Sequence, residues 1–285
     1  MSLADAEKLV SGVIKVASLP EIYMKIESAL ESARSSSKYL ADILSEDAAL
    51  TARILRLANS SFFNYPSKID TVSQAVTVIG TRQLREVVLA SSIVGVFKDI
   101  PNDLIDMDKF WKHNIACGVT CRVIATLRRE TNIETAFVSG LLHDIGRLVL
   151  YKEKPTEMAE LLHTCRNTNK LLFKSEKETF GFDHAILGGL LLKEWRLPNK
   201  LIETTACHHA PNKSREFTTE TATVHIANII TNSLQIGSTG EIFIPPLHAE
   251  SWDVLGLSLE SMELILAETD KQYAVAVEFV LGTQA

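Results

Sequence analysis

Apolar residues recur at helical spacing along nearly the whole chain, and this periodicity constrains the fold more than any other feature. In the segment that begins near Ala48, Leu50, Ile54 and Leu57 lie on one stripe of a helix. Pro20 suits the first position of another helix, because its missing N–H costs nothing there. We expect further helices at 38–44, 72–79, 81–97, 108–129, 134–151, 155–168, 183–195, 198–209, 219–233 and 259–281. The sequence therefore predicts an all-α protein, with only Phe243–Ile244 resembling a strand.

The breaks in this periodicity predict how the chain is divided. Residues 100–103, Ile-Pro-Asn-Asp, mark a boundary between an N-terminal helical subdomain (4–100) and a second helical subdomain (101–285). Residues 1–3 are compatible with a cloning remnant, in which case the chain is a fragment of a longer protein. Residues 59–66 form a loop whose aromatic side chains either dock into the core or present a surface to a partner.

Composition and charge exclude several classes of protein. The 285 residues carry a formal net charge of -6 with no basic run, so we do not expect a nucleic-acid partner. No apolar run approaches the roughly 18 residues of a membrane span, and the N-terminus lacks the pattern of a secretory signal. The four cysteines are too few for a disulfide scaffold, and Cys117 and Cys121 suit buried apolar positions. These features predict a cytoplasmic protein.

The segment around Asp144 carries the clearest chemical signal. Leu141, Asp144 and Leu148 have i, i+3, i+7 spacing, so the carboxylate lies on or beside a buried stripe. An ionised carboxylate there is costly unless it is paired, hydrogen-bonded or bound to a metal. His143 is adjacent and offers a second ligand.

Other histidines lie on apolar helix faces or at helix ends, namely His113, His184, His208 and His209. Asp183 is a suitable N-cap for the helix that begins at His184. Each histidine alone is more simply a hydrogen-bonded core residue, but together with Asp144 the set suits ions such as Zn, Fe or Mn.

The order of these residues and the sequence segments around them resemble a known protein family. The chain resembles the HD superfamily of metal-dependent phosphohydrolases and, more closely, the HDOD family, an HD-related output domain of bacterial signalling proteins. The resemblance covers nearly the whole chain and rests on segments 47–60, 69–76, 79–80, 110–113, 143–144, 181–184, 195–198 and 208–209.

The resemblance implies an HD-like helical bundle packed with a helical N-terminal part. It implies a first metal site containing His113, His143, Asp144 and a late aspartate, and a second site completed by His184, His208 and His209. The metals would lower the pKa of a bridging water, which attacks phosphorus, while Asp144 and Arg147 would serve catalysis, Arg147 by holding the phosphate.

Two departures from the family pattern bear on activity. Asn228 stands at the position of the late aspartate, and an amide brings no negative charge to a metal. Residues 210–214, Ala-Pro-Asn-Lys-Ser, replace the Gly-Tyr-Pro that marks the branch that cleaves cyclic dinucleotides.

These features leave three hypotheses. The first is a bacterial signalling output domain, such as that of a response regulator, which is non-catalytic or weakly catalytic and binds a partner protein or a small phosphorylated ligand. The alternative is a metal-dependent phosphohydrolase acting on a nucleotide or another phosphate ester. In the third, the histidines and Asp144 satisfy one another by hydrogen bonds alone. The sequence leaves the oligomeric state open, and it indicates that residues 152–154 and 174–178 are solvated faces or helix ends.

Overall fold

The computed structural model describes residues 3–14, 18–32, 36–97, 100 and 104–282. These residues form α-helices, two short 3-10 helices and connecting segments, with no β-strand among them. The all-α prediction is confirmed, and the strand-like Phe243–Ile244 lies in an irregular segment. None of the described helices combines the length and the apolarity needed to cross a membrane.

The chain divides into two compact units, each assembled from two separate stretches. The first unit comprises Met1–Ser18 and Asp99–Ala267, and the second comprises Leu19–Lys98 and Glu268–Ala285. One division therefore lies close to the boundary we expected near residue 100, although residues 101–103 are outside the described ones. The two ends of the chain are exchanged between the units. The N-terminal 18 residues belong to the unit that contains residues 99–267, and residues 268–285 belong to the unit that contains residues 19–98.

The N-terminal helix explains part of this exchange. Helix α1 (Leu3–Ile14) buries Ala6, Val10 and Val13. It packs against α9 (Ile145–Glu153) and α12 (His184–Glu194), which belong to the first unit. Of the expected cloning remnant, residues 1–2 are outside the described residues, whereas Leu3 begins this helix.

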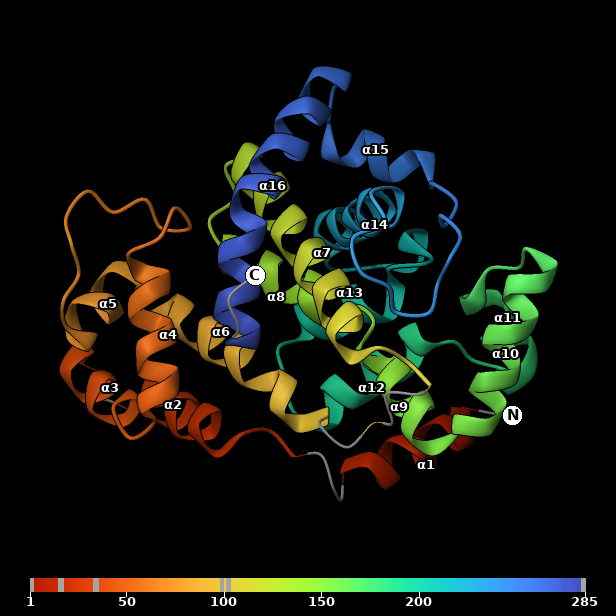
Figure 1. Ribbon diagram of the computed structural model, residues 1–285, viewed down its shortest axis with the longest axis horizontal. Helices are drawn as coiled ribbons and strands as arrows, with labels where there is room; N and C mark the ends of the chain where they lie inside the picture. Colours follow the sequence, from red (N-terminus) through yellow and green to blue (C-terminus); the bar gives the residue numbers. More distant parts are fainter. Residues whose placement is uncertain (1–2, 15–17, 33–35, 98–99, 101–103, 283–285) are drawn as a thin grey trace. The chain divides into compact units, whose positions relative to one another are not determined.

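The second unit is a group of short helices, drawn in orange and gold in Figure 1. They are α2 (Glu21–Glu31), α3 (Ser37–Leu44), α4 (Ala48–Ala58), α5 (Val72–Ile79), α6 (Thr81–Ser92) and the 3-10 helix η1 (Ile93–Phe97), joined by the end of α16 (Leu259–Leu281). Polar caps fix several starts: the Asp47 side chain accepts a hydrogen bond from the N–H of Leu50. In the loop at 59–66, which we expected either to dock into the core or to present a surface, Phe62 is buried and Tyr65 is exposed.

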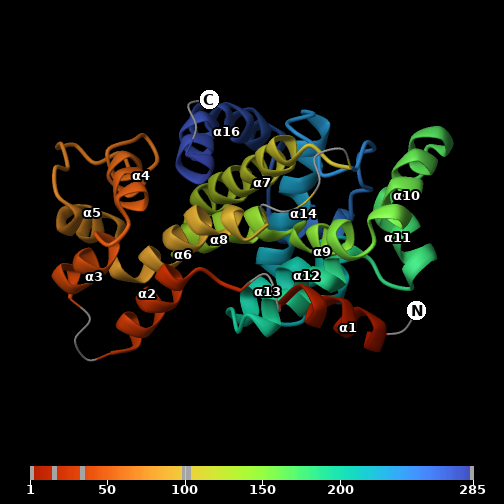
Figure 2. The same ribbon diagram turned by 60° about the horizontal axis from the view of Figure 1, so that its bottom comes forward.

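The first unit contains most of the remaining helices, among them the 21-residue α7 (Met107–Leu127) and the 16-residue α14 (Thr218–Ser233) (Figure 2). Besides these and α1, α9 and α12 it contains α8 (Ile133–Leu142), α10 (Pro155–Thr168), α11 (Leu172–Phe180), α13 (Asn199–Cys207), η2 (Pro211–Lys213) and α15 (Ala249–Leu255). Helix α7 packs against α8 and α14, while α12 packs against α9 and α13. The helices that we predicted from the sequence do not include α1, α11 and α15.

Glycines allow two pairs of these helices to approach closely. A Cβ on Gly140 of α8 would lie 2.7 Å from the carbonyl oxygen of Cys117 and 2.7 Å from the Cα of Gly118, both on α7. A Cβ on Gly146 of α9 would overlap the carbonyl oxygen of His184. Through these contacts the backbone on either side of His143 and Asp144 lies against α7, which carries His113, and against α12, which begins at His184.

The helix expected at 134–151 is two helices in the structure. Helix α8 ends at Leu142, α9 begins at Ile145, and Asp144 between them has φ -97° and ψ 7°. The apolar periodicity continues across this break, so the pattern alone predicts one helix. The break places His143 and Asp144 at a junction, where both side chains reach the same interior region.

Candidate metal centre

The first unit brings together every residue that we predicted as a metal ligand. His113 lies within α7, His143 and Asp144 lie at the α8–α9 junction, His184 begins α12, His208 and His209 follow α13, and Asn228 lies within α14. All of these side chains are buried except His209, which is partly exposed. Asp183 caps α12 as predicted, because its side chain accepts a hydrogen bond from the backbone N–H of Ile186.

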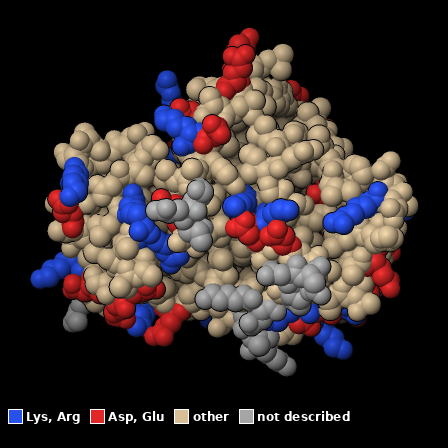
Figure 3. Space-filling view, viewed as in Figure 1, with Lys and Arg blue, Asp and Glu red and all other residues tan. Residues whose placement is uncertain are grey.

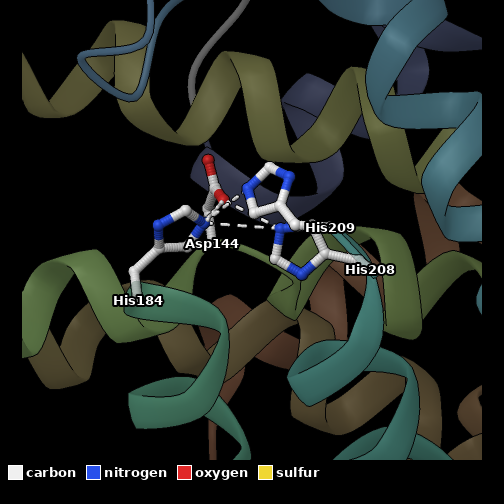
Figure 4. A group of neighbouring side chains, drawn as sticks. All are labelled: Asp144, His184, His208 and His209. Carbon is white, nitrogen blue, oxygen red and sulfur yellow. Dashed lines mark hydrogen bonds and ion pairs between the residues drawn. The ribbon is translucent and has the colours of Figure 1, made fainter. Parts of the chain in front are cut away.

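Asp144 lies at the centre of the cluster. Its Oδ1 atom is 2.8 Å from Nε2 of His184, and 3.5 Å and 3.6 Å from Nε2 of His143 and His208. The Nε2 atom of His209 is 3.2 Å from that of His184. One ligand atom from each of Asp144, His184, His208 and His209 lies within 4.8 Å of the others (Figure 4). A second group of the same kind consists of His113, His143 and Asp144.

Three of the histidines have their ring orientation fixed through Nδ1. The Nδ1 atom of His143 is 2.7 Å from the carbonyl oxygen of Gly140, and that of His208 is 2.8 Å from that of Thr205. For His184 the partner is a carboxylate oxygen of Glu176, at 2.6 Å. A proton on each Nδ1 leaves the Nε2 lone pair for a metal, which is the usual arrangement of histidine ligands. Nε2 of His143 has no hydrogen-bond partner among the described residues.

Most of the histidines are held in the neutral form that metal binding requires. Burial lowers the pKa of His113 to about 4, and burial also lowers the pKa values of His143, His208 and His209.

His184 differs from the other histidines in the metal-free protein. Burial and the charge of Arg147 oppose its protonation, but the carboxylates of Glu176 and Asp144 outweigh them and raise its pKa to about 9. Without a metal, His184 is therefore an imidazolium, whose Nδ1 donates a hydrogen bond to Glu176 and whose Nε2 forms an ion pair with Oδ1 of Asp144 at 2.8 Å.

Asn228 faces His113 but is already engaged. Its Oδ1 atom accepts a hydrogen bond from Nδ2 of Asn232 at 2.6 Å and lies 3.3 Å from Nε2 of His113. An Nε2 proton on His113 pointing at this amide oxygen would occupy the lone pair that a metal needs. The His113 side of the cluster is therefore less ready for a metal than the side formed by His184, His208 and His209.

Arg147 has a different environment from the one we expected of a phosphate-binding residue. Its side chain is 1% exposed. Nε donates to Glu176 at 3.1 Å, and Nη1 donates to Asp144 Oδ2 at 3.2 Å. Nη1 also donates to Oγ1 of Thr239 at 2.6 Å, and Nη2 is 3.9 Å from Glu241. The guanidinium is thus enclosed by protein groups and orders the carboxylates around the histidine cluster.

Two of the carboxylates around Arg147, those of Asp144 and Glu176, are held in the ionised form by neighbouring charges. Although burial alone would raise it, the charges of Arg147 and of protonated His184 hold the pKa of Asp144 well below its usual value. Burial likewise opposes ionisation of Glu176, but His184 and Arg147 lower its pKa. Burial raises the pKa of Glu241, which is farther from the guanidinium.

Three residues of the site, Glu176, Thr239 and Glu241, are not marked by any pattern in the sequence. Residues 174–178 were expected to form a solvated face, which is wrong for Ser175 and Glu176, since both side chains are buried. Alternating lysines and glutamates predict an exposed helix, and only the preceding Leu172–Phe173 pair suggests that one face turns inward. Thr239 and Glu241 lie in an irregular segment with no periodicity to mark them.

The residues of the cluster fit a divalent transition metal. One ligand atom from each of Asp144, His184, His208 and His209 converges on the same point, and three imidazoles with one carboxylate form a donor set that suits Zn, Fe or Mn. In the metal-free protein the guanidinium of Arg147 and the protonated His184 balance the carboxylates of Asp144 and Glu176, so a metal cation would take over the charge that the His184 proton supplies.

An all-α bundle with a buried His-Asp centre defines the class of HD-type proteins. Within this class, a model of the HDOD domain matches residues 16–211. Because this match spans more than half of the chain, the protein belongs to the HDOD family.

Individual relatives are similar at low sequence identity. An uncharacterized protein from Treponema pallidum (strain Nichols) is 24% identical over 228 residues, which cover 79% of this chain and 44% of the relative. The chain thus spans less than half the length of this curated relative.

Solved structures show the same fold. An HDOD domain protein with unknown function from Geobacter sulfurreducens has a TM-score of 0.75 and 24% identity, covering 98% of both chains. A candidate phosphohydrolase from Shewanella amazonensis SB2B has a TM-score of 0.73 and 23% identity, covering 95% of this chain and 97% of that one. A candidate signal transduction protein from Marinobacter aquaeolei VT8 has a TM-score of 0.70 and 18% identity, covering 93% of this chain and 60% of that one.

Proposed function

We propose that this chain is a cytoplasmic bacterial signal-transduction output domain that binds one divalent transition-metal ion and does not turn over phosphate esters. One contrast within the site supports this proposal. Asp144, His184, His208 and His209 are arranged as ligands. The two side chains on which phosphoryl chemistry would depend, Arg147 and Asn228, are instead engaged with other protein groups.

The ion would be Fe, Mn or Zn, held by Asp144, His184, His208 and His209. When bound, such an ion would supply Lewis-acid chemistry and lower the pKa of a bound water. The protein fixes the orientation of two of these ligands, His184 through Glu176 and His208 through the carbonyl oxygen of Thr205. Hydrogen bonding of His113 to Asn228 favours one ion over two.

The partner would be another signalling protein or a small phosphorylated ligand. His209 is the cluster residue nearest to such a ligand from outside, because it is partly exposed while the others are buried. Its ring stacks on Phe173, with centroids 4.0 Å apart and planes 10° apart. On the described surface visible in Figure 3, basic and acidic side chains are interspersed, which favours a partner other than nucleic acid.

Hydrolysis assays on metal-loaded protein test the absence of turnover. The protein would be reconstituted separately with Mn, Fe and Zn, and incubated with bis-p-nitrophenyl phosphate, nucleotides and cyclic dinucleotides. We expect metal binding without hydrolysis above that of an Asp144→Ala control. Hydrolysis that requires both the metal and Asp144 would contradict the proposal.

The second candidate is a metal-dependent phosphohydrolase, and the complete four-ligand group favours it. Three imidazoles and one carboxylate leave a coordination position for water on many transition metals. The same assays separate the two functions, because only the phosphohydrolase predicts product formation dependent on both the metal and Asp144.

A further inference from the structure

The segment between α14 and α15 returns to the cluster and is attached to three helices. The N–H of Ser238 donates to the carbonyl oxygen of Lys109 in the first turn of α7, at 3.0 Å. The Tyr151 hydroxyl of α9 donates to the carbonyl oxygen of Thr239, at 2.8 Å. The Glu241 side chain accepts a hydrogen bond of 2.8 Å from the backbone N–H of Leu172, which begins α11.

Glycines on both sides of Thr239 make this attachment close. Gly237 and Gly240 have φ values of +65° and +99°, a backbone region that disfavours other residues. A Cβ on Gly237 would overlap the carbonyl oxygen of Lys109, and one on Gly240 would overlap the Tyr151 hydroxyl. The chain at 237–240 therefore has little freedom to place Thr239 elsewhere.

The direction of the Thr239 hydroxyl follows from its neighbours. Arg147 can only donate, so its Nη1, at 2.6 Å, makes Oγ1 of Thr239 an acceptor. The single hydroxyl proton then points to Oδ2 of Asp144, at 2.5 Å. Arg147 Nη1 reaches the same Oδ2 at 3.2 Å. Two donors thus hold this oxygen from one side.

The other oxygen of Asp144 faces the histidines. Oδ1 is 2.8 Å from Nε2 of His184 and within 3.6 Å of Nε2 of His143 and His208. Because the carboxylate is planar, fixing Oδ2 also fixes the direction of Oδ1. Thr239 is 1% exposed, so water does not replace its hydroxyl readily.

We propose that Thr239 is a positioning residue of this centre, which turns Oδ1 of Asp144 toward the metal by holding Oδ2. This role rests on the proposed metal binding. It gives the irregular segment 237–241 a part in the site, although none of its side chains is a proposed ligand. Hydrogen bonds to a ligating carboxylate typically change metal affinity by about 10- to 100-fold.

Three variants of the full chain test the proposal. Thr239→Val keeps the shape of the side chain and removes the hydroxyl, whereas Thr239→Ser keeps the hydroxyl. Thr223→Val is a matched control, because Thr223 is buried in the same unit and its hydroxyl donates to the carbonyl oxygen of Thr219 in its own helix, at 2.9 Å. Zn²⁺ affinity would be measured by competition with a chelating dye, and the melting temperature of each metal-free variant by calorimetry.

We expect Thr239→Val to bind Zn²⁺ about 10- to 100-fold more weakly than the wild type. Thr239→Ser and Thr223→Val should stay within about threefold of the wild type, as expected for variants that leave the carboxylate contacts in place. If Thr239→Val does not fold, Thr239→Ala removes the same hydroxyl with less bulk and should show the same loss.

Unchanged Zn²⁺ affinity in a folded variant without the hydroxyl, with only a lower melting temperature, would overturn the positioning role alone. No Zn²⁺ binding by the wild type would overturn the proposed metal binding and the positioning role together. The two failures are therefore distinguishable.

Discussion

Glu176→Gln tests the buried network that orients the ligands. Glu176 is fully buried and accepts hydrogen bonds from the N–H of His184 at 2.9 Å and from Nε of Arg147 at 3.1 Å. Its third contact, to Nδ1 of His184, is 2.6 Å long. The substitution keeps the size of the side chain but removes its charge.

Two effects follow from these contacts. Removing one partner of a buried ion pair costs roughly 3–5 kcal/mol, and because glutamine keeps part of the hydrogen bonding we expect about 3 kcal/mol here. Glutamine has one acceptor oxygen for contacts that both carboxylate oxygens of Glu176 make, so the ring of His184 is held less firmly and metal affinity should fall by about 10- to 100-fold.

Glu178→Gln on the same helix is the matched control. Glu178 pairs with Lys170 at 3.1 Å, but its side chain is 64% exposed. Its substitution should leave both stability and metal affinity within experimental error. Urea unfolding of the metal-free proteins and Zn²⁺ titration measure the two effects. If Glu176→Gln behaved like Glu178→Gln in both assays, our account of the buried network would be refuted.

Three further predictions address packing, proton linkage and stoichiometry. Gly146→Ala forces α9 away from the carbonyl oxygen of His184, so urea unfolding should show a loss of about 3 kcal/mol or more; an unaffected variant would contradict the close helix contact. Below its pKa of about 9, metal-free His184 holds a proton that a metal must displace, so Zn²⁺ titrations should show affinity falling about tenfold per pH unit from pH 8 to pH 6, and a flat profile would contradict this. Asn228→Asp places a carboxylate 3.3 Å from His113, and elemental analysis should find metal content rising from about one ion per chain toward two; an unchanged content would argue against our reading of the His113 side.

The helices and the ligand types could largely be predicted from the sequence, because both depend on local patterns. Apolar spacing identifies α7, α10 and α16 to within a residue or two of their observed ends. Asp144 is buried with Leu141 and Leu148 as their spacing predicts, although that spacing assumes one continuous helix and the structure places Asp144 between α8 and α9. A pattern of this kind reports which side of a helix is buried, whatever the helix packs against.

The environment of the cluster could not be predicted in the same way, because it depends on contacts between residues distant in sequence. Glu176 is read as exposed from its lysine neighbours, although its partners lie on α9 and α12. Thr239 meets Asp144 from a segment without regular structure, 95 positions later in the chain. The enclosure of Arg147 by these groups follows only from the tertiary fold.

The metal content of the purified protein tests the central claim most directly. Inductively coupled plasma mass spectrometry would be applied to the wild type and to Asp144→Ala, before and after reconstitution with Mn, Fe or Zn, with circular dichroism to show that both are folded. We predict about one ion per chain for the wild type and little or none for the variant, because Asp144 lies at the centre of the ligand group. A wild type without metal after reconstitution, or a folded variant with the same content, would contradict the account.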